Sequence, residues 1–221
     1  MALNKLKYNS LNLTPAANKA IGFDSDADAL EATLEGGAIT FIKKLTASSS
    51  STLSFVNGSS DVVLDSTYKE YMFIFNNIHP ATDGAFFQFQ GSTNTGSSYG
   101  VTLTTTKFDA YHNEAGNDTI LSYYANHDLA QSTNFQHLNS YLGTDNDQSG
   151  SGSLHLFNPS STTFVKHFMA RNSANNSDEY MRDNHVAGYF NTTSAIDAVQ
   201  FKMSSGNIDA GTIKLYGIKD S

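Results

Sequence analysis

From Ile39 onward, short apolar runs alternate with short polar turns along the chain. Phe87-Gln88-Phe89-Gln90 alternates apolar and polar residues, which is the period of a strand with one buried face. Tyr71–Phe75 is almost continuously apolar, which predicts a central strand buried on both faces. Asn57-Gly58 and Asp83-Gly84 are dipeptides typical of tight turns between strands. The phenylalanines of the two runs are predicted core residues, namely Phe73, Phe75, Phe87 and Phe89.

Further segments share this strand-like composition and are bounded by turn residues. They lie at residues 39–45, 53–56, 99–104, 108–112, 119–124, 154–157, 164–169, 186–191, 198–203 and 212–218. About ten or eleven short strands without intervening amphipathic helices are typical of two packed antiparallel sheets. We therefore expect an all-β fold, an antiparallel β-sandwich of jelly-roll type. One candidate helix lies inside this domain, at His127–Leu142, where the apolar residues have mixed helical spacing.

Residues 1–37 differ from the rest of the chain. They are rich in small polar residues, contain one weak helical stretch at Ala27–Glu35 and end at Gly36-Gly37. Their apolar residues are too sparse for an independent core and are Leu11, Leu13, Ile21, Phe23, Leu30 and Leu34. Segments of this kind become ordered against a partner. We therefore expect an extended N-terminal attachment arm, residues 1–37, followed by a β-sandwich domain, residues 38–221.

The low content of charge affects the expected partners. Charged residues make up 15% of the 221 residues, against about 25% in an ordinary soluble domain. Such a surface offers little repulsion between copies, so we expect a homo-oligomer, and a trimer if the protein is a fibre. The formal net charge is −8, from 13 Lys and Arg against 21 Asp and Glu. Because these few cations do not cluster, nucleic acid is not an expected partner.

The absence of cysteine and of long apolar runs bears on the cellular compartment in which the protein is expected. Without cysteine the chain has no disulfides, thiolate metal sites or cysteine nucleophile, which favours assembly in a reducing cytoplasm. The opening residues carry positive charge with no apolar run behind them, so no signal peptide is expected. No apolar run approaches the length of a membrane span, so no membrane partner is expected.

No catalytic or cofactor site stands out among the residues. The seven histidines show none of the HxH, HxxxH or HExxH spacings of zinc sites. His155 and His167 lie in expected strands and could face one another across the sheets, although a structural role is favoured. Without a Gly-x-Ser-x-Gly elbow or a phosphate-binding loop, we expect no enzyme activity and no cofactor. Two carboxylates flanking a sugar cleft are an open alternative.

Two acidic segments half-match a calcium-binding loop. Asp145-Asn146-Asp147-Gln148-Ser149-Gly150 has oxygen ligands at alternate positions before the turn glycine, but Leu156 stands where the bidentate acid belongs. Asp24-x-Asp26-x-Asp28 has Glu35 at the last position but Ala29 in place of the glycine. A solvated acidic turn is favoured for both segments. Asp145, Asp147 and Ser149 are the weak calcium candidates.

Several tyrosines near turns could stack on sugar rings, as lectin platforms do. These candidates are Tyr99, Tyr111, Tyr123, Tyr124 and Tyr141. Most of them are expected to be half-buried strand residues, because tyrosine is enriched in strands for packing alone. A host surface glycan is therefore only an optional partner.

Four stretches together resemble a known class of proteins. The stretches are Tyr71–Gly84 with the following Phe87–Thr93, Arg182–Ser194, Gly211–Gly217 near the end and Leu3–Asn12 at the start. They resemble uncharacterised virion structural and tail-fibre-like proteins of marine tailed bacteriophages. The resemblance implies a virion component that is assembled in the bacterial host cytoplasm and contacts other virion proteins through its N-terminal arm.

Three functions fit this resemblance and the composition. A tail fibre or receptor-binding appendage is the first, because an arm followed by a sandwich suits attachment and presentation of a tip. A capsid decoration protein is the second, because a small sandwich with an arm also suits capping a lattice. A free carbohydrate-binding or carbohydrate-active protein is the third.

Overall fold

The computed structural model describes residues 22–23, 30–31 and 38–220. Contacts within the chain divide it into two compact units, residues 1–37 and 38–221. In the first unit, β1 (Gly22–Phe23) pairs antiparallel with β2 (Leu30–Glu31). The predicted helix at Ala27–Glu35 is therefore wrong at Leu30–Glu31, where pairing with another strand replaces a weak local preference. Leu11, Leu13, Ile21 and Leu34 lie outside the described residues, so the attachment arm stays a prediction.

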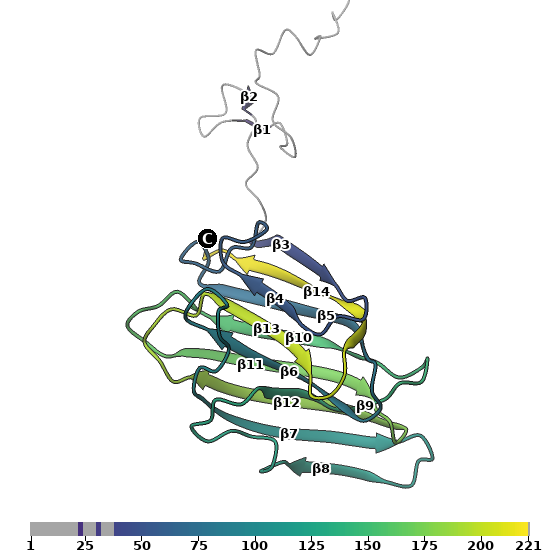
Figure 1. Ribbon diagram of the computed structural model, residues 1–221. Helices are drawn as coiled ribbons and strands as arrows, with labels where there is room; N and C mark the ends of the chain where they lie inside the picture. Colours follow the sequence, from purple (N-terminus) through teal and green to yellow (C-terminus); the bar gives the residue numbers. More distant parts are fainter. Residues whose placement is uncertain (1–21, 24–29, 32–37, 221) are drawn as a thin grey trace, which may run out of the picture. The chain divides into compact units, whose positions relative to one another are not determined.

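The second unit is built from two antiparallel sheets (Figure 1). The larger sheet has eight strands in the order β3 (Ile39–Thr46), β14 (Ile208–Ile218), β5 (Glu70–Pro80), β10 (Gly150–Phe157), β11 (Lys166–Asn175), β12 (Tyr180–Phe190), β7 (Leu103–Asn113) and β8 (Thr119–Tyr123). The smaller sheet has four strands in the order β4 (Leu53–Val56), β13 (Ala198–Met203), β6 (Ala85–Ser92) and β9 (Gln136–Leu142). Residues 38–220 contain no helix, so the all-β antiparallel sandwich is confirmed. Sheets of eight and four strands do not decide the jelly-roll type, which stays a prediction.

An aromatic core joins the two sheets. Phe201 of β13 lies at its centre, with its ring 5.3 to 6.3 Å from five other phenylalanine rings. Those five are Phe55, Phe73, Phe75, Phe87 and Phe89, and each side chain is at most 2% exposed. The four predicted core phenylalanines are therefore confirmed.

Strand β5 is central but is not buried on both faces as predicted. Tyr71, Phe73 and Phe75 point into the core, whereas Met72 and Ile74 on the opposite side are only half-buried. The reason is that the smaller sheet covers one face of the larger sheet. The other face, called here the outer face, has no second layer within residues 38–220 (Figure 1).

The predicted helix at His127–Leu142 is wrong. Residues 127–135 form an irregular segment, and β9 follows as the edge strand beside β6. Pairing with the free edge of β6 satisfies the backbone hydrogen bonds that a short helix with mixed spacing would otherwise have supplied. The strand predicted at residues 108–112 is part of the longer strand β7, which begins at Leu103. The strand predicted at residues 99–104 is wrong at residues 99–102, which lie in the loop before β7, and only its last two residues belong to β7.

Candidate functional site

The interior of the sandwich changes from apolar to polar towards β7 and β12. Strand β9, the last strand of the smaller sheet, packs over β11 and β12, and β7 and β8 lie beyond these two in the larger sheet. On the inner face of β7, buried Leu103 is followed at alternate positions by Thr105, Lys107 and Asp109. We call the group of Lys107, Asp109, Ser140, Arg182 and Asn184 the polar core.

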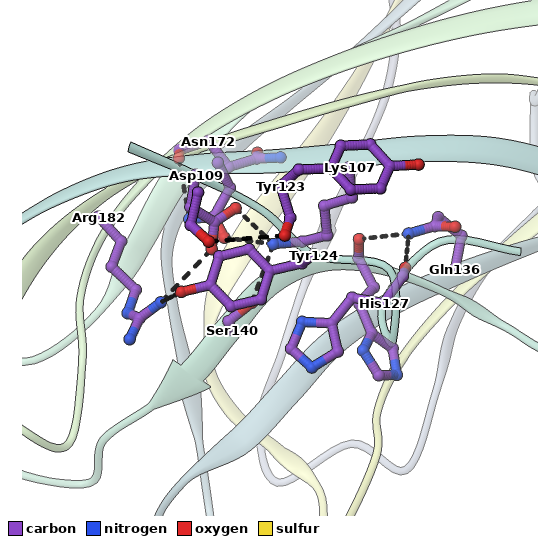
Figure 2. A network of polar contacts seen from close by, with 12 residues as sticks. Lys107, Asp109, Tyr123, Tyr124, His127, Gln136, Ser140, Asn172 and Arg182 are labelled. Atoms are coloured by element: carbon purple, nitrogen blue, oxygen red, sulfur yellow. Dashed lines mark hydrogen bonds and ion pairs between the residues drawn. The ribbon is translucent and has the colours of Figure 1, made fainter. Parts of the chain in front are cut away.

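Lys107 has a closed shell of oxygen partners (Figure 2). Its Nζ donates to Oδ1 of Asp109 at 2.5 Å, Oγ of Ser140 at 3.0 Å and Oδ1 of Asn184 at 3.1 Å. All four side chains are 0% exposed. An ammonium can donate three hydrogen bonds, so its donor capacity is fully used.

Arg182 closes the other side of Asp109. Its Nη1 lies 3.4 Å from Oδ2 of Asp109 and 3.4 Å from the hydroxyl of Tyr124. Its guanidinium lies over the rings of Tyr111 and Tyr141, 4.4 and 5.4 Å from their centroids. A planar, weakly hydrated guanidinium suits such an aromatic enclosure better than an ammonium does.

Burial shifts the titration of these groups. Removal from water lowers the pKa of Lys107, although the neighbouring carboxylate of Asp109 acts in the opposite direction. The hydrogen bond with Tyr124, together with burial, raises the pKa of Tyr111 to about 12. The polar core is thus an electrostatically coupled cluster, and its members were not among the residues predicted from the sequence.

Two histidines lie beside the polar core among aromatic rings. His137 stacks on Phe86 with centroids 4.5 Å apart, and His127 stacks on Tyr124 at 5.3 Å. Burial lowers the pKa of His137 to about 4 and also lowers that of His127. The Nδ1 atoms of both rings are buried and have no hydrogen-bond partner among the described residues. Gln136 fixes this segment by donating from Nε2 to the backbone oxygens of both histidines, each at 2.9 Å.

A polar pocket of about 410 Å³ opens beside these histidines. Its lining includes Gln88, His127, Asp128, Phe135, His137 and Lys202. Lys202 Nζ lies 4.2 Å from the ring centroid of Phe135, a cation–π contact. The segment 127–135, predicted as a helix, forms one side of this pocket.

A second hollow lies on the outer face of the larger sheet. Across this face Arg171 stands opposite His185, and His185 stands opposite Phe108. The rings of His185 and Phe108 are 4.6 Å apart and nearly parallel, at 7°. Two residues further along, Ala187 stands between Met169 and Thr106.

The change from the large rings of Phe108 and His185 to the small side chain of Ala187 forms a depression on the outer face, called here the outer hollow. It has a volume of about 520 Å³ and is walled by Phe108, His155, Phe157 and His185. Its size is in the range of small-molecule sites, and its lining is apolar with a few hydrogen-bonding groups. His155 and His167 lie on the neighbouring strands β10 and β11 of this same sheet, so the expectation that they face one another across the sheets is wrong.

The predicted tyrosines divide into two groups. Tyr111, Tyr124 and Tyr141 converge on Arg182, where they enclose a cation of the protein itself. Tyr123 is 59% exposed on β8 and donates its hydroxyl hydrogen to Asp128. Tyr99 lies in the loop between β6 and β7, half-buried.

The better calcium half-match forms a short turn. The backbone N–H of Gln148 donates to the carbonyl of Asp145 at 3.0 Å, and the buried Gln148 side chain donates to Glu179 at 3.0 Å. Asp145 and Asp147 are exposed and Ser149 is half-buried. The described part of the chain contains no group of three His, Asp or Glu residues that could hold a metal ion. Asp24, Asp26 and Asp28 lie outside the described residues.

No known protein family, curated protein or solved structure matches this chain. Among the described residues there is no helix long and apolar enough to cross a membrane.

Proposed function

We propose that this chain is a structural component of a bacteriophage particle, a tail-fibre or receptor-binding appendage, that acts by assembly and surface contact. The exposed apolar residues at the β8 end of the larger sheet support assembly, and the place in a phage particle rests on the resemblance of the sequence. Ile120, Leu121 and Tyr123 are 41%, 75% and 59% exposed, and Met181 nearby is 48% exposed. Leu121, Tyr123 and Met181 lie on the outer face, and Ile120 lies on the opposite face. The edge strand therefore exposes apolar side chains on both faces, as an interaction site does.

Strand β8 is an open edge. It ends the order of the larger sheet and pairs on one side with β7, from Phe108 opposite Tyr123 to His112 opposite Thr119. Soluble proteins usually protect such an edge with charged residues or proline. The sequence of β8, Thr-Ile-Leu-Ser-Tyr, contains neither. An uncharged apolar edge suits pairing with the same edge of a second copy, and this supports the homo-oligomer.

Light scattering on the full-length protein tests this self-association. Leu121→Lys places a charge on the edge and is expected to convert an oligomer into a monomer at micromolar concentration. Thr162→Lys, in an exposed loop, is the matched control and should leave the oligomer intact. A wild-type protein that is monomeric, or an oligomer that Leu121→Lys leaves unchanged, would contradict the role of β8.

The position in the particle is tested separately. Gold-labelled antibody against this chain should decorate the tail tip in electron micrographs of phage particles. Label spread over the head would instead support the capsid decoration protein, and particles without label would contradict the virion proposal.

The outer hollow favours one other candidate, a free carbohydrate-binding protein. Phe108 and His185 supply ring surface beside the hydrogen-bonding groups of Arg171 and Ser153, a combination that suits sugars. Binding on a glycan array that Phe108→Ala abolishes, by a protein that is missing from particles, would favour this candidate.

A further inference from the structure

Lys107, Asp109 and Asn184 bring an amine, a carboxylate and a carboxamide together in the closed interior of the sandwich. All three side chains are 0% exposed, and Lys107 Nζ contacts both of the others. These are a nucleophile, a proton carrier and an electrophile within reach of one another. We propose that Lys107 and Asn184 condense into an intramolecular isopeptide bond, with Asp109 as the catalytic proton carrier.

The contacts of Nζ orient the amine for this attack. An ammonium donates to Asp109, Ser140 and Asn184 alike, whereas a neutral amine has two N–H groups and one lone pair. With the two N–H groups directed at Asp109 and Ser140, the lone pair faces the carboxamide of Asn184. The carbonyl carbon lies one C=O bond, about 1.2 Å, from the oxygen that Nζ contacts.

Burial acts towards the neutral amine that the attack requires, against the opposing effect of Asp109. Burial lowers the pKa of Lys107, and the charge of Arg182 acts in the same direction. Arg182 also stays charged at 3.4 Å from Asp109. When Lys107 loses its proton, Asp109 therefore keeps a cationic neighbour.

The reaction balances without an added reactant. The amine nitrogen attacks Cγ of Asn184, and a new C–N bond forms while the carbonyl electrons move to Oδ1. Asp109 takes the first proton from the ammonium of Lys107 and delivers it to Nδ2 during the attack, and it then accepts the second proton from the attacking nitrogen. The carbonyl re-forms, the Cγ–Nδ2 bond breaks, and the leaving ammonia takes this second proton from Asp109 and departs as ammonium, which restores the carboxylate. In the starting geometry Nδ2 points to the backbone oxygen of Asn172, at 3.3 Å, and Oδ1 points to the amine.

The bond would link residues 77 positions apart on neighbouring strands. A cross-link of this length restricts the unfolded chain as a disulfide does. The chain has no cysteine, so an amide is the cross-link its residues allow at this place.

Lys166 is an internal control. It is also 0% exposed, but its Nζ donates to the backbone oxygens of Phe164 and Thr192, at 3.1 and 2.9 Å. Neither partner is a side-chain amide with ammonia to release. Burial of a lysine is thus common to both positions, and a facing carboxamide and carboxylate are particular to Lys107.

Mass spectrometry of the full-length folded protein, denatured only for the measurement, tests the proposal. The expected mass is lower than the sequence mass by one ammonia molecule. A digest should contain a branched peptide joining the segments of Lys107 and Asn184, while Lys166 appears in a linear peptide. An unchanged mass would overturn the proposal, because it would leave the polar core as an ion network only. Loss of water with a branch to Asp109 would overturn it as well.

Two variants test the roles of the nucleophile and of the leaving group. Lys107→Arg keeps a cation but removes the nucleophile, so it should retain its full sequence mass. Asn184→Asp should release water in place of ammonia and reach the same final mass as the wild type. If Lys107→Arg does not fold, the wild-type and Asn184→Asp masses still decide the matter.

Discussion

The two ends of the sandwich interior are filled by different kinds of side chain, aromatic rings around Phe201 and polar groups around Lys107. Around Phe201 the sheets meet through phenylalanine rings, and the core needs no hydrogen bonds from its side chains. Around Lys107 the same inner face carries an amine that contacts a carboxylate and a carboxamide, with a guanidinium on the other side of the carboxylate. The apolar end tolerates apolar substitutions that conserve volume, whereas the polar end depends on every partner being present.

The difference also concerns what each end could do. An apolar core that is well packed stabilises the fold and offers no reactive group. A buried polar group is costly unless it is paired, and a buried ion pair is weak evidence for stability by itself. Packing alone therefore does not explain the polar core. A covalent bond between Lys107 and Asn184 would explain it.

The largest effect is expected at the apolar end. Phe201→Ala removes the ring that contacts five others and should lower the free energy of unfolding by about 3–5 kcal/mol, a large part of a domain's stability. Chemical denaturation followed by circular dichroism measures it. Phe164→Ala is the control, because Phe164 is 70% exposed and its loss should leave the midpoint nearly unchanged. Equal effects of the two variants would contradict the central place of Phe201.

At the polar end, loss of the one anion should lower the free energy of unfolding almost as much. Asp109→Ala leaves Lys107 and Arg182 buried without a counter-charge, which typically costs about 3 kcal/mol or more. The same denaturation experiment measures the change. Asp183→Ala is the matched control, since it breaks an ion pair with the exposed Arg171 and should shift the midpoint little. A similar small shift for both variants would show that water reaches the polar core.

The sequence predicts the apolar end well and the polar end poorly. Strands β4 and β13 have the predicted bounds, Leu53–Val56 and Ala198–Met203, because a two-residue alternation is a local signal. In β7 the same alternation misleads, since Phe108 points outward and Lys107 and Asp109 point inward. Their orientation is explained by partners 33 and 77 residues away, Ser140 and Asn184, and no local pattern reports such distances.

The local sequence does not predict the irregular segment before β9, for a related reason. Its apolar spacing indicates a weak helix, but the edge of β6 and the open side of the sandwich determine its structure. The sequence indicates the tyrosines as a group of interest, yet it assigns no role to the cation that three of them surround, Arg182. An inward-facing cation in an alternating strand is the signal that could have pointed to this site.

The smallest expected effect concerns the histidines beside the polar core. Burial lowers the pKa of His137 from 6.5 to about 4 in the folded protein, with the neighbouring His127 acting in the same direction. The unfolded chain therefore binds a proton first as the pH falls. Stability should be constant above about pH 6.5, decline between pH 6.5 and about 4, and level off below that for this group.

The full pKa change corresponds to about 3 kcal/mol in the free energy of unfolding. Because the half-buried ring also lines the polar pocket, solvent should reduce the decline to about 2 kcal/mol, measured by denaturant titration at a series of pH values. His137→Gln keeps a polar side chain that does not titrate, so it should remove most of the slope in this window. His155→Gln, on the outer face of the larger sheet, is the matched control and should keep the slope. An unchanged slope in His137→Gln would mean that water reaches the ring between Phe86 and His127, which would extend the polar pocket to the edge of the polar core.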